Sequence, residues 1–480
     1  MKDIRMIQRS PGTTRRRFLT GAGALAASAA LPAPLRAAAR AGIPHWDLSP
    51  GPISRQLAGP EYGESTLWAY NASIPGPIIR VDQGQPFRVR LTNGLSQATT
   101  LHCHGLRLRN AMDGVPGLTQ SPTAPGETFD YEITAPDAGT FWYHPHYQSS
   151  EQVARGLYGL LIVDERDPLP VDREILLVVD DWRVTPQGLL DTDSFGSLGD
   201  RSHGGRFGNM LTVNGEIRPR FQLRRGERAR VRMCNTANAR PMTFAFPGHD
   251  VTLLALDGQP VAPEELLGAE IALAPGQRAD LLLDCNGPDG SSAQIHEVST
   301  GQAMLAAHLD YADTPLRERA PTSKLALPAN PLPEPNPLDG HVIDLVMEGG
   351  AMGGMRQARY QGQMQSMRAL ADAGQFWAFN GEIGTLGTSL GTVALGRTVH
   401  LTIHNDTAFA HAMHLHGHHF RVIARNGQSV RAEPWRDTEL VPRGERLTLA
   451  FVADNPGKWA LHCHMLEHAA SGMMAHFEVV

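Results

Sequence analysis

A repeated element of ten residues constrains the fold of this chain more than any other feature of its sequence. Each copy begins with Gly, continues as an alternating run of apolar and polar residues, and ends with Asn; the copies span residues 84–93, 226–235 and 396–405. A second element, a turn around Gly followed by alternation, recurs at residues 125–132, 275–282 and 443–450. A turn followed by period-two alternation is typical of a strand start. The long spacing between copies excludes a solenoid and predicts three β-sandwich domains of one type.

The stretch of residues 462–473 carries the strongest chemical signal. Cys463 is followed by His468 five positions later and by Met473 ten positions later. A thiolate, an imidazole and a weak axial thioether are three of the four ligands of a blue-copper site. In a continuing strand, Cys463 points to one face while His462 and His464 point to the other. One backbone segment would therefore contact two metal centres, with the missing His ligand supplied from elsewhere.

Three further His-rich motifs accompany this stretch. The four motifs are His102-Cys103-His104-Gly105, His144-Pro145-His146, the run from His411 to Gly417, and the run from His462 to Met473. In this order they resemble the motifs of the three-domain multicopper oxidases, the family of laccases and bacterial cuprous oxidases. The resemblance covers residues 45–480. It implies an all-β fold of three cupredoxin-like Greek-key β-sandwich domains.

The resemblance also assigns each ligand and implies four copper ions: one type 1, one type 2 and a type 3 pair. The type 1 ligands are His411, Cys463, His468 and Met473. The type 2 ligands are His102 and His414. The type 3 ligands are His104, His144, His146, His416, His462 and His464. The residues agree with this chemistry, because imidazole suits copper and the thiolate–thioether set selects it.

Four copper ions can store the four electrons that reduce dioxygen to water. Protons must also reach the oxygen, and Asp113, nine residues after His104, matches an acid that the family places near the three-copper cluster. We therefore expect Asp113 to relay protons; the alternative is an Asp that forms a turn before Gly114. A second acid of the family is replaced here by Ala469, which leaves a second relay open.

The domain boundaries follow from the repeats and from composition. The predicted domains span residues 45–167, 168–312 and 341–480, and a stiff proline-rich linker spans residues 313–340. Aligning the middle domain with the last replaces the three histidines of the 411–417 motif by Met, Ala and Pro. We therefore expect the middle domain to hold no copper and to act as a spacer that sets the first and third domains face to face.

Residues 1–39 are predicted to be an export signal. Residues 14–19, Thr-Arg-Arg-Arg-Phe-Leu, resemble a twin-arginine signal and precede an Ala- and Gly-rich apolar stretch that ends in small residues. This predicts a protein that is exported folded to the periplasm, and no run is apolar enough to predict a membrane span. We also expect the protein to be a monomer, although the signal itself does not indicate this. Seven of the 43 basic residues and one of the 49 acidic residues lie in this segment, so the rest carries 36 and 48, a net charge of −12. Such a charge argues against a nucleic-acid partner.

Four cysteines are too few for a disulfide scaffold. Cys463 is a candidate ligand, and Cys103 is expected to be a small buried residue, because Leu108 and Asp113 stand where a blue site would need His and Met. Cys234 and Cys285 could pair in an oxidising compartment.

Five methionines lie within 21 residues and bear on the substrate: Met347, Met352, Met355, Met364 and Met367. Residues 356–373 have a helix-forming composition, and thioethers select Cu(I). Bacterial cuprous oxidases carry a Met-rich helix over the blue site, so the resemblance favours Cu(I) as the reductant. The alternative is that these methionines are adaptable apolar filler, in a laccase-like oxidase of phenols and aromatic amines; Ala470, where the cuprous oxidases keep an acid, favours that alternative.

Two further hypotheses assign the chain to other functional classes, a structural protein and a copper-binding protein without oxidase activity. A copper-free cupredoxin protein with a structural role would be expected to lack the histidines that this chain retains. A copper-sequestering binder would keep them and would not turn over dioxygen.

Overall fold

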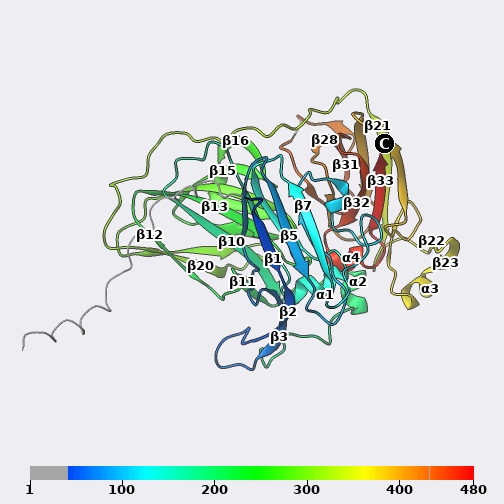
Figure 1. The fold of residues 1–480 in the computed structure, drawn as a ribbon, viewed down its shortest axis with the longest axis horizontal. Coiled ribbons are helices and arrows are strands. Elements are labelled where there is room, and N and C mark those ends of the chain that lie inside the picture. The colour runs from blue at the N-terminus through cyan, green and yellow to red at the C-terminus, as the bar shows by residue number, and fades with distance from the viewer. Residues whose placement is uncertain (1–41, 432) are drawn as a thin grey trace, which may run out of the picture. The chain divides into compact units, whose positions relative to one another are not determined.

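The computed structural model describes residues 42–480 apart from residue 432, and the described part of the chain is mostly β-structure (Figure 1). The strands form three sandwiches of two main sheets each, which confirms the predicted fold class. Figure 1 shows the strands of the three sandwiches in successive colours, from blue and cyan through green to orange and red. The predicted export signal lies outside the described residues.

The first sandwich packs a three-stranded sheet of order β1-β5-β7 against a four-stranded sheet of order β4-β9-β8-β6. A hairpin of β2 and β3 adjoins them. The strands are β1 (His45–Leu48), β2 (Pro50–Arg55), β3 (Ser65–Tyr70), β4 (Ile79–Asp82), β5 (Pro86–Thr92), β6 (His102–His104), β7 (Thr128–Thr134), β8 (Gly139–His144) and β9 (Gly159–Asp164). The short helices are η1 (Asn110–Met112) and α1 (Ser149–Ala154).

The second sandwich has sheets of order β11-β10-β13-β18-β15-β16 and β12-β20-β19-β14-β17. Its strands are β10 (Arg173–Trp182), β11 (Met210–Val213), β12 (Arg220–Leu223), β13 (Glu227–Asn235), β14 (Met242–Ala245), β15 (Asp250–Leu256), β16 (Gln259–Glu265), β17 (Glu270–Leu273), β18 (Arg278–Cys285), β19 (Ser292–Glu297) and β20 (Met304–Tyr311). Its helices are α2 (Leu198–Ser202) and η2 (Leu267–Ala269).

The third sandwich has sheets of order β24-β21-β26-β31-β28-β29 and β25-β33-β32-β27-β30, with a separate hairpin of β22 and β23. Its strands are β21 (His341–Gly349), β22 (Gln357–Tyr360), β23 (Gln363–Ser366), β24 (Trp377–Phe379), β25 (Ser389–Val393), β26 (Thr398–Asn405), β27 (His411–Leu415), β28 (Arg421–Arg425), β29 (Gln428–Ser429), β30 (Thr438–Val441), β31 (Arg446–Val452), β32 (Gly457–Cys463) and β33 (Met474–Val479). Its helices are α3 (Met367–Asp372) and α4 (Leu466–Ala469).

The two repeated sequence elements form the same strand pair in every sandwich. They become β5 and β7, β13 and β18, and β26 and β31, and each pair is antiparallel. In β5 the residues alternate between buried and more exposed positions, as a strand with one face in the core requires. The repeat in the sequence is therefore a repeat of one structural unit.

The cores differ in how far they extend. The second sandwich has a core cluster of its own, whereas one continuous cluster of buried side chains includes residues from both the first and the third sandwich. Residues 313–340 contain neither helix nor strand. Within the described residues no helix combines the length and the apolar character that a membrane crossing needs.

Candidate metal centres

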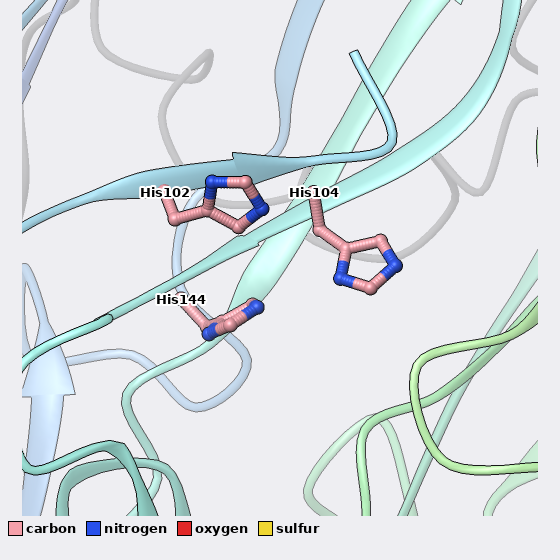
Figure 2. Close-up of side chains that lie close together, drawn as sticks. All are labelled: His102, His104 and His144. Atoms are coloured by element: carbon pink, nitrogen blue, oxygen red, sulfur yellow. The ribbon is translucent and has the colours of Figure 1, made fainter. Parts of the chain in front are cut away.

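Two pairs of neighbouring strands carry the His-rich motifs. In the first sandwich β6 pairs with β8, so that His102 lies opposite His144. In the third sandwich β27 pairs with β32, so that His414 lies opposite His462. Because side chains alternate along a strand, His102 and His104 share a face of β6; Figure 2 shows both beside His144 on the adjoining strand. The same alternation turns Cys463 away from its two neighbouring histidines and separates two clusters.

The smaller cluster contains one thiol and two imidazoles. The Sγ atom of Cys463 lies 3.7 Å from Nδ1 of His411 and 3.7 Å from Nδ1 of His468, and these two nitrogens are 3.1 Å apart. All three side chains are fully buried, and Met473 is buried in the same core. Burial raises the pKa of the Cys463 thiol to about 12. The thiolate therefore needs a bound cation to form here, as a metal ligand does.

Hydrogen bonds to the outer ring nitrogens fix both imidazoles of this cluster. Nε2 of His468 lies 2.7 Å from the carbonyl oxygen of His203, which can only accept, so Nε2 carries the proton. Nε2 of His411 lies 2.8 Å from the hydroxyl of Thr407, whose own hydrogen points to Asn405 Oδ1 at 2.7 Å. Both Nδ1 atoms are therefore unprotonated and face the sulfur, which suits a copper ion bound by two imidazoles and a thiolate.

Segments of the second and third sandwiches cover this cluster. The ring of Trp377 lies 4.5 Å from that of His468 and 4.9 Å from that of His411, measured between ring centroids. Its Nε1 donates to the carbonyl of Arg201 at 2.6 Å, and the amide of Ala351 donates to the carbonyl of Ser202 at 2.6 Å. Together with the His203 carbonyl, these contacts close the ring of His468 to direct approach by a bulky molecule.

The larger cluster contains eight buried imidazoles, four from each terminal sandwich. They are His102, His104, His144, His146, His414, His416, His462 and His464. The rings of His104 and His414 stack at 3.7 Å, and Nε2 of His462 lies 3.0 Å from Nε2 of His416 and 3.3 Å from Nε2 of His146. Several triplets within the cluster have their ring nitrogens within 4.8 Å of one another.

Most rings of this cluster have their outer nitrogen anchored, although His146 Nδ1 and both nitrogens of His464 have no partner among the described residues. Nδ1 of His102, His144, His414 and His462 donates to the carbonyls of Asp113, Pro145, Asp437 and Cys463, respectively. Nε2 of His102, His144 and His414 has no hydrogen-bond partner among the described residues. Burial also lowers the pKa of His416 to about 3 and that of His144 well below its usual range, so these rings are neutral. Neutral, inward-facing lone pairs left unpaired in a buried site are what copper ions need.

Asp113 lies beside this cluster and is fully buried. Its Oδ2 accepts from Nδ1 of His416 at 2.8 Å, and its Oδ1 lies 3.2 Å from Nδ1 of His102. Burial raises the pKa of Asp113, but His416 and His102 outweigh burial and hold it well below its usual range. The carboxylate therefore orients two imidazoles that come from different sandwiches.

A second buried carboxylate, Asp437, was missed by the sequence analysis. Its Oδ1 lies 3.2 Å from Nε2 of His104, and both its oxygens accept from Arg278 of the second sandwich, at 2.9 and 2.6 Å. Burial raises the pKa of Asp437, but Arg278 and His104 outweigh burial and hold it well below its usual range. No local signal marks this residue, because its partners lie 159 and 333 positions away in the sequence.

The methionine-rich segment does not form the helix expected over residues 356–373. It forms the hairpin β22–β23 and only then the short helix α3, because Gln361 and Gly362 adopt positive φ values and turn the chain back. Met347 is fully buried in the core, which makes it packing. Met352 and Met364 are 80% and 54% exposed. The remaining two, Met355 and Met367, are partly buried against a small cluster around Leu370.

All four cysteines are free and buried. Cys234 and Cys285 lie at opposite ends of the paired strands β13 and β18, opposite Arg278 and Glu227, respectively. Seven residues of strand separate them by roughly 23 Å, too far for a disulfide. The possible pairing is therefore wrong for this structure, whereas Cys103 is the small buried residue that the sequence predicted.

Comparison with known proteins gives one match for each of the three sandwiches. Three family models described as multicopper oxidase match residues 53–168, 173–298 and 357–480. The chain is 30% identical to the multicopper oxidase MmcO of Mycobacterium tuberculosis, with 96% of this chain and 92% of that protein covered. It is 30% identical to Laccase-1 of Botryotinia fuckeliana, with 85% and 77% covered. The crystal structure of a multi-copper oxidase from Pseudomonas thermotolerans superimposes with a TM-score of 0.77 at 32% identity, covering 91% and 99%.

Fold, buried ligand sets and relatives together define a copper-dependent oxidoreductase built from cupredoxin-like sandwiches. The chain belongs to the multicopper oxidase family. It is therefore an enzyme that binds copper and uses dioxygen together with a reducing substrate.

Proposed function

We propose that the protein oxidises Cu(I) to Cu(II) and reduces dioxygen to water. Four Cu(I) ions, one dioxygen molecule and four protons would give four Cu(II) ions and two water molecules. The observation that supports this most directly is the position of Cys463, whose side chain lies in the smaller cluster while its sequence neighbours His462 and His464 lie in the larger one. One short stretch of backbone joins the two sites covalently.

The proposed ligand sets follow the motifs. His411, Cys463, His468 and Met473 would hold the type 1 ion, and His102 and His414, whose free Nε2 atoms face inward, would hold the type 2 ion. The type 3 pair would be held by His104, His144, His146, His416, His462 and His464. When bound, these ions supply the one-electron storage that the reaction needs. Asp113, in contact with imidazoles of both sandwiches, is proposed to deliver protons there.

The cover over the smaller cluster supports a small reductant. Nε2 of His468 is hydrogen-bonded to the His203 carbonyl, and Trp377 packs over the ring. A bulky phenol would therefore have to displace these residues before it could contact His468. Met352 and Met364, both exposed, belong to the segment that joins this cover through Ala351. Thioethers are soft ligands that bind Cu(I).

A laccase-like oxidase of phenols and aromatic amines remains the second candidate, because Laccase-1 of Botryotinia fuckeliana is among the relatives. The buried imidazole set argues against a copper-free structural protein. We also propose that residues 1–39 direct export to the periplasm by the twin-arginine pathway, where Cu(I) needs oxidation, and that the protein works as a monomer.

Steady-state oxidation of Cu(I) and of a phenol, measured side by side, tests the substrate. Changing Met352, Met355, Met364 and Met367 together to Leu conserves volume and should cost little stability. We expect the KM for Cu(I) to rise roughly tenfold, about 1.4 kcal/mol of binding, while phenol oxidation stays near the parental rate. The control is Met347→Leu, which removes a sulfur from the core and should leave both activities unchanged. Unaltered Cu(I) kinetics in the fourfold variant would make these methionines packing and favour the laccase-like activity.

A further inference from the structure

In the second sandwich, which has no His-rich motif, the turn that leads into β18 (residues 275–278) reaches the larger cluster. A Cβ on Gly276 would lie 3.0 Å from His464 and 3.1 Å from His104, so only Gly allows this close approach, at φ +85°. The next residue, Gln277, donates from Nε2 to the carbonyl of Thr438 at 2.7 Å. The second sandwich is therefore part of the wall of the cluster as well as a spacer.

Arg278 follows in this turn and is completely buried. Its Nη1 and Nη2 donate to the two oxygens of Asp437 at 2.9 and 2.6 Å, and Nη1 also donates to the carbonyl of Gly276 at 3.0 Å. Its backbone amide donates to Oδ1 of Asp257 at 2.9 Å. The planar guanidinium matches a carboxylate with two parallel hydrogen bonds, which Lys cannot reproduce.

Asp437, which Arg278 holds in place, in turn contacts two imidazoles of the cluster. Its Oδ1 contacts Nε2 of His104, whose Nδ1 has no partner among the described residues. Its backbone carbonyl accepts from Nδ1 of His414 at 2.9 Å. A proton held on the outer nitrogen leaves the inner nitrogen of each ring free for a metal ion, and such outer partners set ring orientation.

We propose that Arg278 is a positioning residue for the cluster of eight imidazoles, acting through Asp437 on His104 and His414. This inference rests on the proposed copper assignment of that cluster. Without the guanidinium, Asp437 would be a buried carboxylate without its main partner, and leaving such a charge unpaired is costly. The carboxylate would then turn away from His104 or be neutralised. Either change frees the ring of His104 to rotate and removes the 3.5 Å approach of Oδ1 to Nδ1 of His414, whose hydrogen bond to the Asp437 carbonyl remains.

The other two copies of the repeated turn do not have this role. The residue equivalent to Arg278 is Thr128 in the first sandwich, where it is exposed at the start of β7. In the third sandwich it is Arg446, with 57% of its side chain exposed and its nearest carboxylate 3.7 Å away. Only the middle copy combines a buried Arg with a carboxylate that touches the cluster. The second sandwich, which supplies none of the eight histidines, thus contributes Arg278 to the surroundings of the cluster.

The test compares Arg278→Lys and Arg278→Gln with a matched control, Arg230→Lys. Arg230 is also buried, in the strand β13 paired with β18, and its partners Glu165 and Asp280 bind none of the eight histidines among the described residues. The full chain is loaded with copper, and metal content is followed against increasing chelator together with the blue absorbance and the electron paramagnetic resonance of the type 2 ion. We expect both Arg278 variants to lose cluster copper 10- to 100-fold more easily, to keep the blue absorbance, and to show an altered type 2 spectrum.

The double variant Arg278→Gln with Asp437→Asn distinguishes positioning from packing. It removes both charges, so it should recover part of the copper affinity lost in Arg278→Gln alone. The proposal is overturned if Arg278→Lys retains parental copper affinity and spectrum, or if Arg230→Lys alters both to the same extent. A parent chain that binds no cluster copper would instead overturn the proposed function.

Discussion

Each imidazole whose outer nitrogen donates to a carbonyl is fixed in one tautomer. His102 donates to the Asp113 carbonyl and His468 to the His203 carbonyl, so the chain chooses which nitrogen of each ring is free. The free nitrogen differs between the two clusters. It is Nε2 for His102 in the larger cluster and Nδ1 for His468 in the smaller cluster. Orientation is therefore set by backbone atoms and is insensitive to most side-chain substitutions nearby.

Asp113, like Asp437, is an exception at this scale, because its side chain contacts the rings. In Asp113→Asn the amide oxygen can still accept from Nδ1 of His416, while the neutral amide cannot carry a proton. We expect dioxygen reduction to slow by roughly 10²- to 10⁴-fold, the usual range for loss of acid–base catalysis. Stopped-flow measurement should show reduction of the blue site unchanged. Equal slowing of both half-reactions would assign Asp113 a structural role.

Among the elements, the strands were more predictable than the hairpin β22–β23. Alternation in residues 86–92 or 398–405 is a property of neighbouring residues, so sequence alone locates β5 and β26. The segment around residues 356–373 has no such pattern, and its fold depends on the pairing of Arg359 with residues 381–383 and on Leu370 packing into a remote cluster. For the same reason the histidine ligands could be proposed from their motifs, whereas Arg278 and Asp437 could not.

This hairpin with α3 can be replaced by a short linker, at the cost of the two backbone hydrogen bonds that Arg359 makes with Gly381 and Ile383. The amide of Gly350 donates to the carbonyl of Phe376 at 2.8 Å, so the ends of the segment already lie together. Replacing residues 352–373 by a short Gly–Ser linker should raise kcat/KM for a phenol by roughly tenfold or more, about 1.4 kcal/mol, because the cover is smaller, and should lower it for Cu(I). Kinetics with both substrates check this; a parallel fall for both would show that the segment supports the site and does not select its substrate.

At the scale of the whole molecule, ion pairs join the first and second sandwiches. Glu174 of β10 binds Arg80 of β4 at 2.6 Å and Arg232 of β13 at 2.7 Å. Burial raises its pKa, but Arg232 and Arg80 outweigh burial and lower it from 4.5 to about 2. The stabilisation is therefore complete above about pH 4.5 and is lost as the pH falls through about 2.

Glu174→Gln should remove this stabilisation, which is of the order of 3 kcal/mol at most. In the copper-free chain we expect a lower Tm than in the parent at pH 7 and a difference that shrinks as the pH falls from about 4.5 to about 2. Glu264→Gln, at an exposed position of β16, is the control and should leave the pH profile of Tm as in the parent. A difference between Glu174→Gln and the parent that is independent of pH would exclude the ion pairs as its cause.

The division of the eight imidazoles between the ends of the chain has a consequence for biogenesis. Four come from residues 102–146 and four from residues 414–464, so a nascent chain carries only half of them until its synthesis reaches residue 414. The last two imidazoles, His462 and His464, come from the end of β32 and the residue after it, so the larger cluster is completed late in synthesis. A chain that ends before residue 464 therefore lacks at least one imidazole of the larger cluster, however well its first two sandwiches fold.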